Sequence, residues 1–347
     1  MCTIATGTAP WISRRPNPDR LRFPRANVEC LPRSPGTAFM LTLYAPAKIN
    51  WFLEVTGKRP DGYHELVTVM QAISLYDRLD FSTRREPGLS LTCNMDLGPP
   101  EKNLVYRAGE LLRLRHAPDR GASIHLEKRV PHGAGLGGGS SDAAAAVVGL
   151  NKLWGLQLAN RVLEGLVSEV GSDCAFFVQG GVALCTGRGE IIEHKPPIPR
   201  VHLVILYPNI VLPTVNVYRD LSRRLTYQPR NCYFFHDDGA RNSAKTLPRV
   251  IFNRLEESAL RVSPELSEVW QRTAAEAGVT CRFVSGSGSS IAFVMEDGLA
   301  AQVLAGKLEQ RGLGRAFAVT TVTVGVSEHQ DEGDRSIRGA DQAGQRP

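Results

Sequence analysis

The sequence predicts an α+β protein built from two domains, and three observations carry that prediction. The chain has 347 residues, more than one domain usually holds, and its 42% hydrophobic content is enough for a sizeable core. Strand-like runs of aliphatic and aromatic residues are interleaved with segments of helical period. A break near Ile198-Pro199 precedes a very apolar run, 201–207, with which we expect the second domain to begin.

The first domain is expected over residues 40–198. Residues 41–56 resemble a strand pair and 66–82 a second strand-rich run, and Pro60-Asp61-Gly62 provides turn chemistry between them. The later elements are a helix capped by Asn103, a strand over 124–130, a helix from Ser140 to about Trp154, a helix from Asn160 to Gly171, and two short strands bounded by Gly180-Gly181 and Gly187–Glu190.

The second domain is expected over residues 199–326. After the strand at 201–207, residues 222–249 are polar and irregular and predict a long surface loop. The elements that follow are a helix from Asn253, a helix with Ser263 as N-cap and Gly278 at its end, a small-residue turn at 285–290, a strand over Ile291–Met295, a helix over 298–311 and a strand over 317–326.

The two ends of the chain differ from its middle. Residues 1–39 are rich in Pro, Arg and small polar residues, and we expect them to be disordered. They faintly resemble an organellar transit peptide, but we favour an upstream start with Met40 as the true beginning, because strand-like sequence follows at once. Residues 327–347 are charged and polar, and we expect a disordered tail.

Charge and cysteine usage narrow the class of protein. The net charge of +6 lies mostly in residues 1–39, so the rest of the chain has no concentrated basic patch and we expect no nucleic-acid partner. The seven cysteines are scattered without metal-ligand spacing, which indicates reduced thiols and a cytoplasmic location. No apolar run approaches membrane-spanning length and no signal-peptide pattern is present, so we expect no membrane partner.

The most informative stretch is Pro131 to Ala146, which reads PHGAGLGGGSSDAAAA. Glycines let the backbone approach a ligand closely, and the good helix formers that follow predict a helix whose free N–H groups stabilise a phosphate. The alternative is a tight strand-to-helix connection or a linker. No lysine follows the glycines, which excludes a Walker A loop. The GxGxxG that it contains lies too far along the chain, with Glu164 inside a helix, for a dinucleotide fingerprint.

A phosphate loop without its own lysine needs catalytic charge from elsewhere in the chain. Phosphoryl transfer requires neutralised phosphates, a metal ion and a carboxylate that orients the attacking hydroxyl. Asp173, just past a predicted helix end, is a candidate for that carboxylate, and Lys48, a cation in an apolar strand, is a candidate for its partner. Taken singly, Asp173 also suits a turn or cap, and Lys48 also suits a solvated surface.

Six motifs together resemble the GHMP superfamily of small-molecule kinases. They are PAKIN (46–50), DGYH (61–64), PHGAGLGGGSSDAAA (131–145), GSDCAFF (171–177), GRGE (187–190) and SGSGSS (285–290). The resemblance covers about residues 41–326. It implies a ribosomal-protein-S5-domain-2-like nucleotide-binding domain followed by a ferredoxin-like α/β sandwich. PAKIN with DGYH, the triple-glycine loop and GSD-x-x-FF is similar to the branch that phosphorylates the 2-hydroxyl of a methylerythritol cytidine diphosphate ester on the non-mevalonate route to isopentenyl diphosphate.

The resemblance also implies site residues and ligands. Lys48 and Asp173 match the catalytic pair, while Asn50, Tyr63, His64 and Tyr218 match substrate-binding positions, three of them around the cytosine ring. The positions that match the ATP site are Lys128, Pro131, Gly133, Gly135, Leu136, Gly137, Gly138, Gly139, Ser140 and Ser141, backed by Gly286 and Ser287. ATP and Mg²⁺ are the implied cofactors, with Ser141 near the ion and no residue assigned as a metal ligand. We expect a small-molecule substrate and a monomer or weak homodimer.

Three departures from the family pattern leave these groups in place. Cys174-Ala175 stands where the family commonly has an aliphatic residue and proline, Arg254 reverses a charge, and 222–249 is longer and more polar than usual. Two other functions stay open: a kinase of the same superfamily for another alcohol, such as mevalonate or homoserine, and a non-catalytic nucleotide-binding regulator on the same fold.

Overall fold

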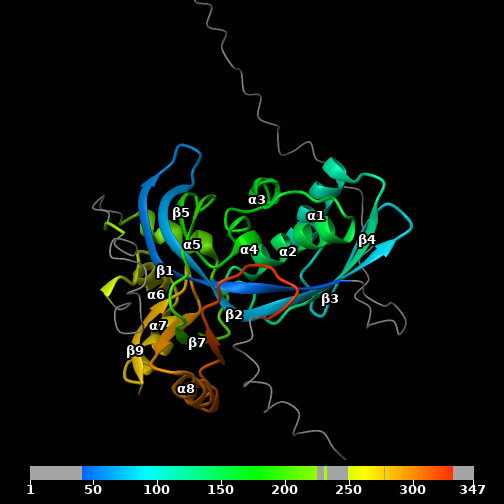
Figure 1. Cartoon of the computed structure of the whole chain (residues 1–347). Helices are drawn as coiled ribbons and strands as arrows, with labels where there is room; N and C mark the ends of the chain where they lie inside the picture. The colour runs from blue at the N-terminus through cyan, green and yellow to red at the C-terminus, as the bar shows by residue number, and fades with distance from the viewer. Residues whose placement is uncertain (1–40, 225–229, 233–248, 277, 331–347) are drawn as a thin grey trace, which may run out of the picture.

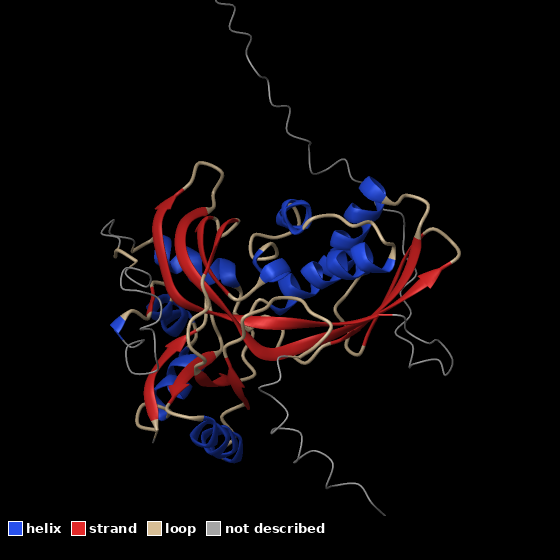
Figure 2. Cartoon of the chain, viewed as in Figure 1, coloured by secondary structure: helices blue, strands red, loops and turns tan. Residues whose placement is uncertain are grey.

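The computed structural model describes residues 41–224, 230–232, 249–276 and 278–330. The predicted leader, most of the predicted tail and most of the predicted 222–249 loop lie outside these residues. The part of the chain that the structure describes forms two sheets with helices against them, as the α+β prediction requires. Figure 2 shows the long strands of the first sheet, the helices over one of its faces and the smaller second sheet beside it.

The first sheet has seven strands and is built around two long ones. Its strands are β1 (Leu41–Lys58), β2 (His64–Arg84), β3 (Gly88–Cys93), β4 (Gly121–Glu127), β5 (Val182–Gly187), β6 (Ile191–Lys195) and β8 (Phe252–Asn253). Their order is β3-β4-β2-β1-β8, and β5 pairs with both β2 and β6. The predicted strand pair over 41–56 is wrong, because β1 is one strand that pairs with β2 along its length. Pro46 is tolerated inside it because the register shifts there.

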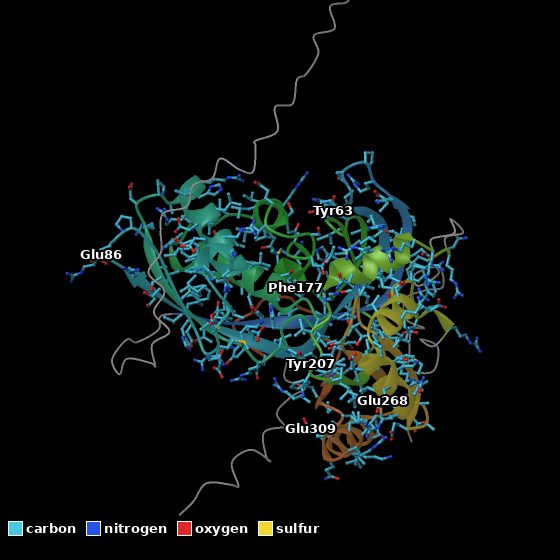
Figure 3. All side chains as sticks on the ribbon, turned by 180° about the vertical axis from the view of Figure 1, so that it is seen from behind. Tyr63, Glu86, Phe177, Tyr207, Glu268 and Glu309 are labelled. Atoms are coloured by element: carbon cyan, nitrogen blue, oxygen red, sulfur yellow. The ribbon has the colours of Figure 1, made fainter. Side chains whose placement is uncertain are left out.

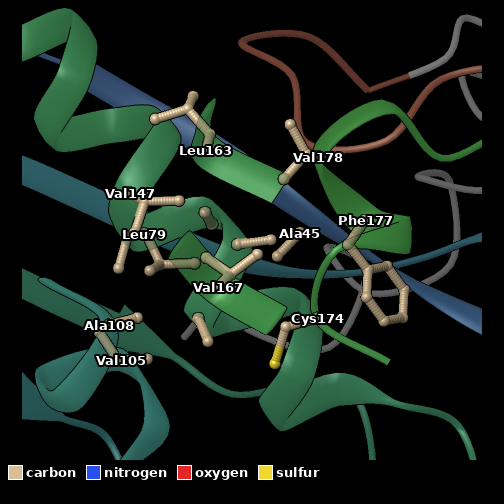
Figure 4. Packing of buried hydrophobic residues seen from close by; sticks show 14 of the residues in the cluster. Ala45, Leu79, Val105, Ala108, Val147, Leu163, Val167, Cys174, Phe177 and Val178 are labelled. Carbon is tan, nitrogen blue, oxygen red and sulfur yellow. The ribbon is translucent and has the colours of Figure 1, made fainter. Parts of the chain in front are cut away.

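Four α-helices and a short 3₁₀ helix, η2 (Pro100–Lys102), belong to this layer (Figure 1). The α-helices are α1 (Leu104–His116), α2 (Gly138–Leu153), α3 (Asn160–Ser168) and α4 (Phe176–Gln179). Asn103 caps α1 as predicted, because its side chain accepts a hydrogen bond from the Val105 N–H. The alanines of α2 are buried, and Gly149 lets this helix approach the sheet so closely that a Cβ there would lie 2.3 Å from the Phe81 ring. Figure 4 shows Val147, Leu163 and Phe177 in the core between these helices.

The second sheet has four antiparallel strands in the order β11-β7-β10-β9. They are β7 (His202–Tyr207), β9 (Val279–Val284), β10 (Ile291–Met295) and β11 (Arg315–Thr320), with helices α5 (Thr214–Ser222), α6 (Glu256–Val262), α7 (Pro264–Arg272) and α8 (Gly298–Gln310). With the helices between them, the strands follow the β-α-β-β-α-β sequence of a ferredoxin-like unit. The Trp51 and Phe283 rings, 5.7 Å apart, pack the two sheets together.

Several predicted boundaries in this unit shift. The helix predicted from Asn253 begins at Glu256, because 252–253 pair with β1 as strand β8. Ser263 caps α7 as predicted, but the helix ends at Arg272, where the Thr273 hydroxyl bonds to the Val269 and Trp270 carbonyls. The strand predicted over 317–326 ends at Thr320.

Two segments late in the chain return to the first sheet. Strand β8 adds to β1, and the chain after β11 pairs through Thr321 with Ile73 and through Ser327 with Tyr44. The disorder predicted from residue 327 is therefore wrong for 327–330. We propose that the division between 40–198 and 199–326 holds for the bulk of each sheet, while β8 and the chain after β11 join the first sheet. None of the helices in the described ranges is apolar and long enough to cross a bilayer.

Candidate active site

The glycine-rich stretch lies between β4 and α2 and forms a loop on the sheet. Gly133, Gly135 and Gly137 have positive φ angles of 65°, 78° and 70°, which glycine adopts without a steric cost. Helix α2 begins at Gly138, not at the predicted Ser140, because Gly137 takes the left-handed conformation at the N-cap. Glycines thus occupy the start of the first turn, where backbone N–H groups have no helical partner and remain available to an anion.

The small-residue turn between β9 and β10, residues 285–290, supports this loop from behind. The Ser290 N–H donates to the Ala134 carbonyl at 3.1 Å, and the Ser285 hydroxyl donates to the Gly135 carbonyl at 3.1 Å. A Cβ on Gly135 would lie only 2.2 Å from the Ser285 carbonyl oxygen. Asn253 holds the turn in place by donating to the carbonyls of Val284 and Gly286. The two segments, about 150 residues apart in sequence, thus form one rigid wall.

Lys48, Asn50 and Asp173 meet beside the loop. The Lys48 Nζ donates to the Asn50 Oδ1 at 2.7 Å and lies 3.7 Å from the Asp173 Oδ2. Burial lowers the pKa of Lys48, and the charge of Asp173 opposes this effect. The Lys48 N–H also donates to the Leu136 carbonyl at 2.9 Å, which ties β1 to the loop. The Asp173 side chain is 32% exposed, so it combines an ion pair with access to a ligand.

The Cys174-Ala175 departure leaves Asp173 in the cavity wall. Cys174 is buried, packed among the core residues drawn in Figure 4. Burial raises the pKa of its thiol to about 12, so it stays protonated at neutral pH. The Phe176 and Phe177 rings that follow contact each other edge to face, 5.1 Å apart, and are fully buried. The aromatic pair of the GSDCAFF motif therefore anchors the short helix behind Asp173.

Aromatic and imidazole side chains form the other end of the site. Tyr63, labelled in Figure 3, is 55% exposed, and its ring lies 4.9 Å from the Arg188 guanidinium. The His64 and Tyr218 rings contact each other with centroids 4.9 Å apart and planes at 30°. His64 Nε2 also forms a hydrogen bond of 2.8 Å with the Ser222 hydroxyl. Burial and the nearby charge of Lys58 lower the pKa of His64, which favours the neutral imidazole.

These groups line one cavity of about 790 Å³. Its wall includes every predicted site residue except Lys128 and Ser141. Asp173 is the only carboxylate among the described residues that line it, against four lysine and arginine side chains: Lys48, Lys58, Arg188 and Arg219. Such a wall suits polyanionic ligands. The last three cations were not predicted as site residues; Arg188 belongs to the GRGE motif, whose sequence gave it no role.

Lys128 lies below the glycine loop, away from the cavity wall. Its Nζ is buried between the carboxylates of Asp77 and Asp142, with the Asp142 Oδ2 at 2.8 Å. Asp77 also accepts hydrogen bonds from the Arg129 and Val130 N–H groups. Burial and the charge of Asp77 raise the pKa of Asp142. The Lys128 side chain thus bridges β2, α2 and the strand that leads into the loop, and its predicted place near the nucleotide stays a prediction.

The implied Mg²⁺ would need oxygen donors from the residues around the loop. No cluster of three or more His, Cys, Asp or Glu side chains that would hold a metal occurs within the described ranges. Mg²⁺ needs only one or two protein oxygens when phosphates and water complete its octahedron. The Ser141 hydroxyl, fully buried in the first turn of α2, has no hydrogen-bond partner among the described residues. Asp173 in the cavity wall and Ser141, buried in the first turn of α2, are hard oxygen donors of the kind that this ion takes, so the residues present fit it.

Comparison with known proteins gives the family. A model of the GHMP kinases N terminal domain matches residues 103–181. The 4-diphosphocytidyl-2-C-methyl-D-erythritol kinase of Pelotomaculum thermopropionicum is 40% identical over 253 residues, 73% of this chain and 88% of that protein. The protein of the same name from Synechococcus sp. strain CC9605 is 48% identical over 203 residues, 58% of this chain and 65% of that protein.

Solved structures agree with the sequence comparison. A crystal structure of 4-(cytidine 5'-diphospho)-2C-methyl-D-erythritol kinase aligns with a TM-score of 0.68 and 35% identity, covering 81% of this chain and 99% of the other. A homoserine kinase from Cytophaga hutchinsonii aligns with a TM-score of 0.63 at 18% identity, which shows a shared GHMP kinase fold alone. With this fold, and with 40% identity over most of a relative, the chain belongs to the 4-diphosphocytidyl-2-C-methyl-D-erythritol kinase family of GHMP kinases.

Proposed function

We propose that this chain transfers the γ-phosphoryl group of ATP to the 2-hydroxyl of 4-diphosphocytidyl-2-C-methyl-D-erythritol. The products are the 2-phosphate and ADP, a step of the methylerythritol phosphate route to isopentenyl diphosphate. One observation carries the proposal: a single cavity holds a phosphate-type loop, a lysine–aspartate pair and an aromatic end. The family to which the chain belongs supports the choice of substrate.

The glycine loop binds the phosphates of ATP in this proposal. Its free N–H groups at the start of α2 and the positive end of the helix dipole stabilise their charge. The loop is held rigid by Lys48, whose N–H donates to Leu136, and by the 285–290 turn. Rigid donors need no reorganisation when charge develops, so they favour the transition state. Bound Mg²⁺, with Ser141 and Asp173 as nearby oxygens, would neutralise phosphate charge.

Asp173 and Lys48 act on the hydroxyl in this scheme. Asp173 accepts or orients the hydroxyl proton as the oxygen attacks. Lys48, 3.7 Å away, holds the carboxylate and balances charge on the group in transfer. Asn50 fixes the position of Lys48, because its amide nitrogen is in turn bound to the Thr68 hydroxyl at 2.8 Å. The chain thereby supplies the charge that a Walker lysine would bring to a P-loop enzyme.

The aromatic end recognises the cytosine ring. Tyr63 and Tyr218 provide apolar ring faces. His64, in the same cavity wall, provides a group that can form hydrogen bonds. Clamping the base places the far end of the substrate in line with the γ-phosphate, so that positioning supplies much of the rate. We also propose a cytoplasmic enzyme that acts as a monomer or weak homodimer on this small molecule alone.

An ADP-release assay tests the proposal. The purified chain is incubated with ATP, Mg²⁺ and one alcohol at a time: the diphosphocytidyl ester, mevalonate or homoserine. We expect ADP with the ester alone, and a phosphorus NMR spectrum of the product should show a new monoester at the 2-position. ADP release with mevalonate or homoserine instead would contradict the substrate. ATP binding without ADP release from any alcohol would support the non-catalytic regulator.

A further inference from the structure

Arg188 occupies a defined place in the cavity wall that the proposed function leaves unexplained. It lies in the turn between β5 and β6, and its guanidinium is 4.9 Å from the centre of the Tyr63 ring. The turn is held by Glu190, whose carboxylate accepts the Arg188 N–H and lies 3.6 Å from its Nε. Positive φ angles at Gly187 and Gly189 give the turn its tight shape. The 32% exposed side chain is thus presented from a rigid support.

The distribution of charge shows which kind of ligand group this arginine would meet. Of the four cations that line the cavity, Lys48 is paired with Asp173. Lys58 pairs with His64 across β1 and β2, Arg188 lies over the Tyr63 ring, and Arg219 follows Tyr218 in α5. The phosphates of ATP have their own donors in the glycine loop. The cations at the aromatic end favour a second anionic group, and the Arg188 side chain, although 3.6 Å from Glu190, remains open to the cavity where the other substrate would lie.

The order of groups in the proposed substrate matches the order of residues along this wall. The diphosphate stands between the cytidine and the erythritol that carries the reacting hydroxyl. Arg188 stacks on Tyr63, at the base end, and a Cβ on the next residue, Gly189, would lie 3.5 Å from the Asp173 Oδ1. The turn therefore spans the distance between the base-binding end and the catalytic carboxylate.

The geometry points to Arg188 as the residue that binds the substrate diphosphate. Its planar guanidinium can stack on Tyr63 and donate to phosphate oxygens with the same fork. Arg188 is then a specificity-determining residue, which makes the site prefer a cytidine diphosphate ester over cytidine or a neutral alcohol. This inference rests on the proposed function, because the ester is what places a diphosphate there.

Calorimetric titration with cytidine and with cytidine diphosphate tests the role of Arg188. In Arg188→Ala we expect the affinity for cytidine diphosphate to fall about 10- to 100-fold, the loss of a charge-assisted contact. Cytidine should bind within about twofold of wild type, since it lacks phosphate. Arg315→Ala is the matched control, because Arg315 also lies over an aromatic ring, Phe317, at 5.0 Å but outside the cavity. ATP affinity serves as the readout of correct folding.

Each outcome has a defined meaning. An equal fall for cytidine and cytidine diphosphate would show that Arg188 only supports the Tyr63 ring and would overturn the inference. An unchanged preference of Arg188→Ala for the diphosphate over cytidine would also overturn it, while leaving the proposed function intact. Wild-type protein that bound neither ligand while still binding ATP would contradict the proposed function itself. A selective loss of diphosphate affinity, absent from Arg315→Ala, supports the assignment.

Discussion

Among single residues, the site combines one buried cation with groups that open into the cavity. Lys48 is 5% exposed, yet it has both an amide and a carboxylate as partners. Asp173 remains open to the cavity, and His64 is held against Tyr218. Each of these residues has a distinct proposed role, so a substitution at each should change a different kinetic or binding constant.

Asp173→Asn should lower kcat by at least about 10²-fold, the low end for loss of a general base. The amide keeps the shape of the side chain, so ATP affinity should stay within about twofold. Steady-state kinetics and ATP titration measure the two quantities. Asp119→Asn, at an exposed turn, is the matched control and should behave like wild type. Near-normal turnover in Asp173→Asn would rule out the base.

Lys48 should set an alkaline limit to activity. An ordinary lysine loses its proton at about pH 10.4. Because burial lowers the pKa of Lys48, its ammonium group is fully charged at low pH and loses its charge at a lower pH than an ordinary lysine does. We expect the alkaline limb of kcat/KM, which reports the free enzyme, to lie below that of kcat, since bound phosphates stabilise the cation. Lys48→Arg should lack this limb, because a guanidinium stays charged. A limb that persists there belongs to another group.

His64→Ala should raise KM for the cytidine ester by about 10-fold or more, the loss of one hydrogen bond and a ring contact, with ATP affinity unchanged. His64→Phe keeps a ring against Tyr218 but removes the nitrogens. If the hydrogen bond dominates, both variants should be similarly weak; if ring contact dominates, the phenylalanine variant should recover. Loss of ATP affinity in either variant would contradict the assignment of His64 to the cytidine ester.

At the scale of elements, the glycine loop depends on a turn that comes from the other sheet. Hydrogen bonds from the turn to the Ala134 and Gly135 carbonyls join the two segments. Their close fit depends on the absence of a Cβ at Gly135. The loop and the turn are each recognisable from their own sequence motif. Their contact involves backbone atoms in two distant parts of the chain, which no local pattern in the sequence specifies.

Gly135→Ala should separate these two segments and weaken ATP binding. Its cost includes left-handed strain of about 1–2 kcal/mol and the displacement of the Ser285 carbonyl, which lies 2.2 Å from the new Cβ. Gly155→Ala is the matched control, because Gly155 has a φ of 66° but no atom within 4 Å of a Cβ. Thermal unfolding should show strain in both variants. Loss of ATP affinity should occur in Gly135→Ala alone, and equal behaviour would contradict the coupling.

For the molecule as a whole, the late segment around β8 is fastened to the first sheet, far from it in sequence. Arg254 donates to both carboxylate oxygens of Glu54 on β1, each at 2.7 Å, and its N–H donates to the Leu53 carbonyl. Burial alone would raise the pKa of Glu54, but hydrogen bonds from Arg254 and from the Arg230 and Val55 N–H groups lower it. Arg254, the position where the charge is reversed relative to the family pattern, thus has a buried partner in Glu54 and contributes to the structure.

Arg254→Met should lower the free energy of unfolding by about 2–4 kcal/mol. This lies toward the lower part of the range for breaking a buried pair, because 29% of the Arg254 side chain is exposed. Glu54→Leu combined with Arg254→Met should recover part of the loss, since no buried charge is left unpaired but the Arg230 and Val55 N–H groups lose their acceptor. Denaturant unfolding of both variants measures this. A double variant no more stable than the single one would show that the pair is not the source of the effect.

From its sequence, this protein is recognisable by most of its helices and by the chemistry of its motifs. Asn103 and Ser263 cap the helices that their local patterns predict, and the six motifs together indicate phosphoryl transfer. Tertiary structure alone decided which of these groups meet. It placed Lys128 between two buried carboxylates, and it brought Arg188 beside Tyr63. The reason is physical: hydrogen bonds and periodicity within an element are local, whereas a cavity wall is set by how distant elements pack.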